Sequence, residues 1–138
     1  MSNWINKKTG DVVRYSPGVS KNWLEEHSWI VDKKKLAQIL STEGGVDVFV
    51  SGIPSNTVDI LDLFDAVFLL QISANTIRRR LAERMDVGAF GKSDDEIDDI
   101  MRWKDEFIKT MKIHGVISID AEKSLSEVVE EILLKSLK

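Results

Sequence analysis

Residues 66–73 read AVFLLQIS, an apolar run with almost no alternation between apolar and polar positions. A strand with one face in solvent alternates such positions, whereas a strand covered on both faces does not. Helical patterns flank this run along the chain, so it predicts a parallel sheet with helices above and below it. The expected fold class is therefore α/β, in the form of a three-layer sandwich.

Two further segments fit the same sheet. Residues 46–51, VDVFVS, are β-branched and aromatic and predict a buried strand, and residues 116–120 predict another strand. Helices are expected after an N-cap at Asp32, across 57–64, across 75–85, from Ser93 to about residue 114, and after Ser124. Ser93 and Ser124 each open an S-x-x-E capping box. The last helix is expected to bury a stripe made of Leu125, Val128, Val129, Ile132 and Leu133.

Length and composition restrict the domain organisation and the class of protein. The 138 residues favour one domain, 1–138, with an irregular segment at 1–31, in which only 12–15 suggests a short strand, and an α/β core at 32–138. The net charge of −4 argues against nucleic acid as the main ligand. The chain has no cysteine, no apolar run that could span a membrane and no signal-like N-terminus, so a cytoplasmic location without membrane association is expected.

The segment 86–96, DVGAFGKSDDE, contains the Gly-Lys-Ser triplet that ends a phosphate-binding P-loop. A P-loop requires G-x-x-x-x-G-K-[ST], but only two residues separate Gly88 from Gly91. The segment also follows a predicted helix, whereas a P-loop follows a strand. This segment is therefore not predicted to be a P-loop.

Two arginines precede this segment on the predicted helix. Ile77 and Leu81 form its apolar stripe, with Arg80 on the flank of the stripe and Arg84 almost on it. One interpretation is that these arginines pair with neighbouring carboxylates. The other is that both face a cleft and bind an anion, because a guanidinium group donates two parallel hydrogen bonds to phosphate.

The order of these motifs resembles a known family. RLAER at 80–84, the loop after it and the acidic helix that follows are similar to the lid of P-loop kinases of the adenylate-kinase and shikimate-kinase type. VISIDAEKSLSEVVEEIL resembles the last strand and helix of that fold, and VDVFVSGIPSN resembles the strand and turn over the phosphoryl acceptor. The resemblance covers about residues 29–137, with the lid at about 84–93. WINKKTGDVVRYSPG, in addition, resembles a segment of bacterial nucleoside-kinase-like ATPases.

The resemblance implies roles for particular residues. The implied catalytic residues are Arg80, which would contact the adenine side or the phosphates of ATP, and Arg84, which would approach the phosphates undergoing transfer. Lys92 would be an auxiliary phosphate contact or simply a solvated lysine. The turn at 120–123 would lie against the adenine, and the acceptor turn would bind substrate. ATP and Mg²⁺ are the implied cofactors. The implied cofactor-binding residues are Lys92, Asp120, Ala121, Glu122 and Lys123, and the implied substrate-binding residues are Gly52, Ser55 and Asn56.

The sequence departs from the family pattern in two ways. Ser55 and Asn56 stand where adenylate kinases place an arginine, so a neutral or differently charged acceptor is expected, unless these residues only cap the next helix. The 138 residues contain no G-x-x-x-x-G-K-[ST], so the first, central strand and the P-loop are expected to be missing. The chain is then a fragment of a longer kinase, a product of a misplaced start, or a degenerate relative whose gap is filled by its own N-terminal residues or another subunit.

These expectations favour part of an ATP-dependent kinase for a nucleoside- or nucleotide-like acceptor, inactive alone. The alternative is a non-catalytic nucleotide-binding or oligomerisation module, and an incomplete sheet would favour a homo-oligomer. The tryptophans Trp4, Trp23, Trp29 and Trp103 either line a base-stacking cleft or pack beneath irregular chain. The aspartates 59, 62 and 65 and the acidic run 94–99 are interpreted as solvated helix faces rather than a metal site, and no metal site is predicted.

Overall fold

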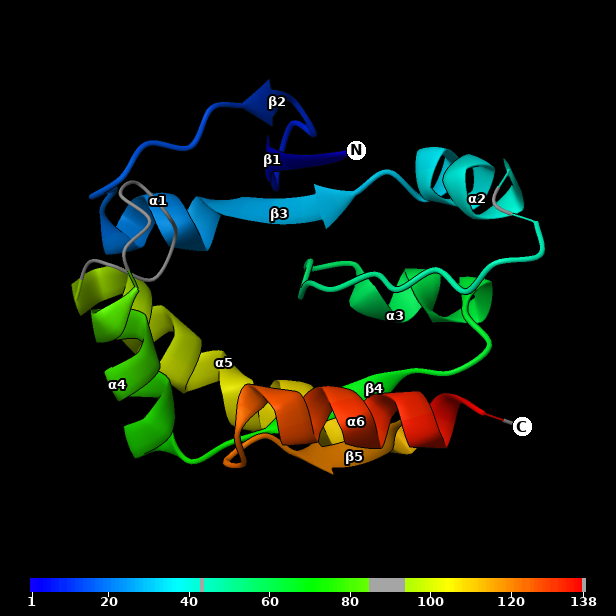
Figure 1. The fold of residues 1–138 in the computed structure, drawn as a ribbon. Helices are drawn as coiled ribbons and strands as arrows, with labels where there is room; N and C mark the ends of the chain where they lie inside the picture. The colour runs from blue at the N-terminus through cyan, green and yellow to red at the C-terminus, as the bar shows by residue number, and fades with distance from the viewer. Residues whose placement is uncertain (43, 85–93, 138) are drawn as a thin grey trace. The chain divides into compact units, whose positions relative to one another are not determined.

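The computed structural model describes residues 1–42, 44–84 and 94–137. These residues fall into two compact units, 1–64 and 65–138, each with its own small core. The first unit contains β1 (Ser2–Asn6), β2 (Val12–Val13), α1 (Lys21–Glu26), β3 (His27–Val31), α2 (Lys33–Thr42), α3 (Thr57–Ile60) and a 3-10 turn, Leu61–Leu63. The second contains β4 (Phe68–Gln71), α4 (Ala74–Glu83), α5 (Asp94–Ile113), β5 (Ile117–Asp120) and α6 (Leu125–Ser136) (Figure 1).

The first unit is built on a three-stranded antiparallel sheet in the order β2-β1-β3. A tight turn joins β1 to β2: Asn6 Oδ1 accepts the N–H groups of Lys8 and Thr9, and Gly10 takes a positive φ of 76°. Residues 1–31 were predicted to be irregular, and this prediction was wrong. The short strand suggested at 12–15 forms as β2, but it pairs with β1 in this antiparallel sheet, not in a parallel one.

The helical part of the first unit closes a core under the end of β3. Val31, Leu36 and Ile60 are buried together, with Leu40, Leu63 and Phe64 packed against them. The predicted N-cap is confirmed, because Asp32 Oδ1 accepts the Lys35 N–H at 3.1 Å at the start of α2. The short helix expected across 57–64 is also present.

The buried strand predicted at 46–51 does not form. Residues 46–51 have no regular structure and are exposed, with Val46 at 63% and Phe49 at 56% of full exposure. A β-branched run becomes a strand only where another strand can accept its backbone hydrogen bonds. Within the described residues, the runs 66–73 and 116–120 found such a partner in each other.

The second unit contains the predicted parallel pair. β4 and β5 lie side by side in register, with Leu69 opposite Ser118 and Gln71 opposite Asp120. Ile119 is fully buried and, with Ala121 and Val128, forms the core on which α6 packs. The coarse prediction of a mixed α/β chain is confirmed. The three-layer P-loop-kinase arrangement around a longer parallel sheet stays a prediction.

Fewer apolar side chains of β4 and α6 are buried in the second unit than the sequence predicts. Leu69 is buried in β4, whereas Leu70 is about half exposed, so this strand is not covered on both faces. The predicted stripe of α6 is also partly wrong. Val128 is buried and Ile132 packs against the core, but Leu125, Val129 and Leu133 are exposed. A two-stranded sheet offers too little surface to cover the whole apolar stripe of a helix.

Candidate functional site

The candidate site is the edge of the second unit where β4 and β5 both end. In parallel strands the carboxyl ends lie at the same edge, and in α/β proteins this edge is where ligands bind. The Ala121 N–H donates to the Gln71 carbonyl at 3.0 Å and extends the pairing by one residue. β4 then continues through Ser73 into α4, and β5 continues through the turn 121–124 into α6.

Glu122, in the β5–α6 connection, bonds to residues of the β4–α4 connection and of α4 itself. Its carboxylate accepts the backbone N–H of Ser73 at 2.6 Å and the hydroxyl of Thr76 at 2.7 Å. The Ser73 hydroxyl in turn accepts the Thr76 N–H at 3.2 Å and caps α4. Thr76 is only 7% exposed, so its hydroxyl needs such a partner. The carboxylate of Glu122 therefore lies at the N-terminal end of α4, where an anion is stabilised by the helix dipole.

The charge state of Glu122 reflects these contacts. The Ser73 N–H, and after it the Thr76 hydroxyl, hold the pKa of Glu122 below its ordinary value of 4.5. The positive charge of Arg80 adds a smaller contribution that lowers the pKa in the same direction. Arg80 is an exposed residue of α4, and among the described residues no hydrogen bond or ion pair joins it to Glu122.

Arg84 does not occupy the helical position that the sequence suggested. α4 ends at Glu83, and Arg84 follows it in an extended conformation, with φ −62° and ψ 137°. The position of Arg84 near the apolar stripe assumed a helix that continues to about residue 85, so that part of the prediction was wrong. Arg84 is exposed. The predicted lid residues 85–93, including Lys92 and Ser93 of the first capping box, lie outside the described residues.

The other residues of the predicted base turn are engaged within the turn and α6. Asp120 Oδ1 accepts the Glu122 N–H at 2.9 Å, and Ala121 is buried. Lys123 Nζ lies 3.5 Å from Glu131 Oε2 on α6. The N-cap predicted at Ser124 is confirmed, since its hydroxyl accepts the Glu127 N–H at 3.3 Å; in place of the second bond of a capping box, the Ser124 hydroxyl donates to the Glu127 carboxylate at 3.0 Å.

The predicted acceptor turn lies in the first unit and pairs with β3. The Ser55 N–H donates to the Trp29 carbonyl at 2.7 Å, and the Asn56 side chain bonds both backbone groups of Val31. Asn56 makes no side-chain capping bond to α3, so the alternative that it caps this helix is wrong. Gly52 has a φ of 153°, and a Cβ there would lie 3.7 Å from the indole of Trp29. These three residues cover the outer edge of β3.

The tryptophans divide between the two units. Trp4 and Trp23 pack together with Tyr15 in the first unit, and Trp4 and Trp29 line a cavity there. Trp103 packs edge-on against Phe107 in the second unit, with ring centroids 5.6 Å apart. Sequence reasoning considered the tryptophans but missed Arg14 and Tyr15, which line the same cavity. The alternation of side chains along 12–15 was the signal that could have found Tyr15.

The acidic residues do not form a metal site in the described part of the chain. Asp62 pairs with Lys33 at 2.9 Å, and Asp99 pairs with Arg102 at 2.8 Å. Among residues 1–42, 44–84 and 94–137, no group of three or more histidine or carboxylate side chains could hold a metal ion. In the same residues, no helix is both long enough and apolar enough to cross a membrane.

The described residues do not fit a magnesium–triphosphate cradle. Such a cradle needs several backbone N–H groups aimed at the phosphates, a lysine and a hydroxyl for the metal. Here the Ala121 and Glu122 N–H groups donate within the protein, and Lys123 lies beside Glu131. The helix that begins at this edge carries the exposed Arg80 in its last turn. We therefore derive no phosphoryl-transfer step from this site.

No family model, curated protein or solved structure matches the chain. The resemblance to P-loop kinases therefore stays a prediction.

Proposed function

We propose that the chain supplies the lid and base-turn part of an ATP-dependent kinase for a small nucleoside- or nucleotide-like acceptor. In this proposal it binds nucleotide through Arg80 and Arg84 and does not transfer phosphoryl groups by itself. The single observation that carries the proposal is the parallel pairing of β4 with β5, which puts the 120–123 turn and the start of α4, the helix that carries Arg80, at their common carboxyl edge.

The engagement of Glu122 favours a second candidate, a non-catalytic nucleotide-binding or oligomerisation module. The N-terminal end of α4 already holds the carboxylate of Glu122, through bonds of 2.6 and 2.7 Å. A nucleotide would then be held by the arginines rather than by a helix N-terminus. This candidate predicts ATP binding that is insensitive to Mg²⁺, because no metal-holding group is required.

The two arginines at positions 79 and 80 allow a matched test. Both are exposed on α4, but only Arg80 contributes to the lowered pKa of Glu122. ATP binding is measured by calorimetry for the unmodified protein, Arg80→Gln and Arg79→Gln. We expect Arg80→Gln to weaken binding by about three- to tenfold and Arg79→Gln by less than about twofold. Equal effects of the two substitutions, or no binding of ATP to the unmodified protein at millimolar concentration, would contradict the proposal.

Turnover separates the two candidates from an active enzyme. ATP hydrolysis and transfer to nucleosides are measured on the same preparation, with Mg²⁺ present and then with a chelator. We expect no turnover above background, because transfer needs electrostatic stabilisation that this edge does not provide. Turnover that Arg84→Ala abolishes would show that the chain is a complete catalyst and would overturn the non-catalytic part of the proposal.

A further inference from the structure

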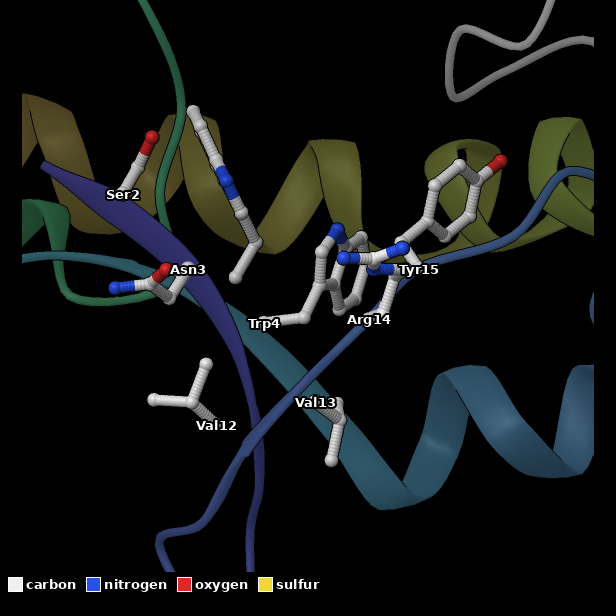
Figure 2. Close-up of a pocket in the computed structure, with 8 residues that line it drawn as sticks. Ser2, Asn3, Trp4, Val12, Val13, Arg14 and Tyr15 are labelled. Atoms are coloured by element: carbon white, nitrogen blue, oxygen red, sulfur yellow. The ribbon is translucent and has the colours of Figure 1, made fainter.

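A shallow cavity of about 460 Å³, largely open to solvent, lies on the antiparallel sheet of the first unit (Figure 2). This volume is in the range of sites that hold small molecules. All three strands contribute to it, together with the residues that follow β2. The lining residues are Ser2, Asn3, Trp4, Val12, Val13, Arg14, Tyr15 and Trp29.

The register of the sheet creates an aromatic surface in this cavity. Trp4 on the central strand is directly opposite both Val13 of β2 and Trp29 of β3. Residues directly opposite each other in an antiparallel pair point to the same face. Val13, Trp4 and Trp29 therefore form a row across one face of the sheet, with two indole rings in it.

Neighbouring rings hold this surface in place. Tyr15 stacks on Trp4 with ring centroids 5.5 Å apart and an angle of 17° between the planes. Trp23 packs against Trp4 at 5.2 Å and is itself stacked on His27 at 4.1 Å, and the His27 ring lies 2.7 Å from the Trp23 carbonyl. Rings fixed in this way lose little conformational entropy when a ligand stacks on them.

Arg14 gives the cavity a positive charge. Its side chain lies with Trp4 and Tyr15 in the same lining (Figure 2). None of the ion pairs between described residues involves Arg14. A guanidinium group beside aromatic faces disfavours a cationic ligand and favours a carboxylate or phosphate. Among the residues that the structure describes, no carboxylate lines the cavity.

We propose that this cavity binds a planar aromatic or heteroaromatic anion. The ring stacks on the Trp29 indole beside Trp4, whose own ring is already stacked with Tyr15, and the anionic group pairs with Arg14. Two sources share this chemistry, a nucleoside phosphate and an aromatic carboxylic acid. The described residues that line the cavity all lie between 2 and 29, so the proposal does not rest on the function proposed for Arg80 and Arg84.

The test uses the indole N–H resonances of the tryptophans in ¹⁵N-labelled protein. The probes are two matched pairs, 2-naphthoate with 2-naphthamide and AMP with adenosine. We expect an anionic probe to shift the Trp4 and Trp29 resonances with about millimolar affinity or better, while Trp103 in the second unit does not shift. We expect the neutral partner of each probe to bind at least about threefold more weakly. The pair that responds identifies the source.

Arg14→Gln removes the charge and keeps most of the side-chain length. Since Arg14 is exposed, this variant is expected to fold, and its circular dichroism spectrum checks this. We expect Arg14→Gln to reduce the affinity for the anionic probe to that of the neutral one and Arg79→Gln to leave it unchanged. The proposal is overturned if neither anionic probe shifts Trp4 and Trp29. It is equally overturned if the charged and neutral probes bind with the same affinity to the unmodified protein and to Arg14→Gln. Shifts of Trp103 alone would report binding in the second unit and would also count against this cavity.

Discussion

The side-chain amide of Asn56 bonds both backbone groups of Val31. Its Oδ1 accepts the Val31 N–H at 3.0 Å, and its Nδ2 donates to the Val31 carbonyl at 2.9 Å, across 25 residues of sequence. An amide can do this because it carries both a donor and an acceptor in one plane. Asn56 thus takes the place of a neighbouring strand at the outer edge of β3.

A substitution at Asn56 tests whether this residue of the predicted acceptor turn has a structural role or is available to bind substrate. Asn56→Ala removes both bonds and leaves the partly buried groups of Val31 without them, so we expect a loss of about 2 kcal/mol in the free energy of unfolding. Urea denaturation followed by tryptophan fluorescence measures it, because three of the four tryptophans lie in the first unit.

Ser55→Ala is the matched control for this measurement. Ser55 is exposed and contributes its backbone N–H, which alanine retains, so we expect a change below about 0.5 kcal/mol. If Asn56→Ala were as stable as the unmodified protein, the side chain would be available for substrate and the structural interpretation would be wrong.

Glu122 gives the second unit a pH-dependent stability. A carboxyl group whose pKa is lower in the folded state than in the unfolded chain stabilises the fold at pH above the ordinary value of 4.5. That contribution is lost as the pH falls through the lowered pKa of the folded state. Glu122→Gln replaces one accepting oxygen by an NH₂ group, which cannot accept the Ser73 N–H or the Thr76 hydroxyl proton.

We therefore expect Glu122→Gln to be less stable than the unmodified protein at neutral pH, with a difference that shrinks as the pH falls below 4.5. Urea denaturation followed by far-ultraviolet circular dichroism, at several pH values and constant ionic strength, measures this. Glu130→Gln, an exposed residue on α6, is the control and should show no such convergence. A stability difference for Glu122→Gln that is independent of pH would contradict the assignment.

The sequence predicted the local features of this fold much better than the contacts between distant residues. The N-caps at Asp32 and Ser124 were predictable because cap and helix are adjacent along the chain. The pairing of Trp4 with Trp29 was not, because two tryptophans 25 residues apart carry no sign that β1 and β3 are neighbours. The prediction of a strand at 46–51 was wrong for the same reason. The composition of this segment is typical of a strand, but no partner strand pairs with it in the described residues.

The candidate site shows the same division. The expectation that Arg80 lies on the flank of its helix needed only the helical period, and the structure places Arg80 in the last turn of α4. The Glu122 contacts with Ser73 and Thr76 span 49 and 46 residues, so they depend on the parallel pairing of β4 with β5. No local sequence pattern distinguishes a glutamate that bonds across two strand–helix connections, as Glu122 does, from one whose side chain only faces solvent.

Two adjacent valines on α6 test which face of that helix is buried. Val128 is 6% exposed and packs in the core of the second unit, whereas Val129 is 46% exposed. Val128→Ala should cost about 2 kcal/mol, from lost apolar burial and the cavity that remains. Val129→Ala should cost less than about 0.5 kcal/mol, because alanine also has the higher helix propensity. Chemical denaturation followed by circular dichroism measures both. Similar losses at both positions would indicate that another surface covers Val129 in solution, as in an oligomer.

Phe49 tests whether residues 46–51 are a strand in the protein. A phenylalanine buried in a strand costs about 3–5 kcal/mol when it is replaced by alanine. Phe49 is 56% exposed, so we expect Phe49→Ala to change the free energy of unfolding by less than about 0.5 kcal/mol. Phe64→Ala is the matched substitution in the same unit, and because Phe64 packs against Val31, Leu36 and Ile60, we expect it to cost about 3 kcal/mol. Tryptophan fluorescence during urea denaturation reports both variants. A large loss for Phe49→Ala would mean that this segment joins a sheet in solution, which is what the kinase resemblance requires of it.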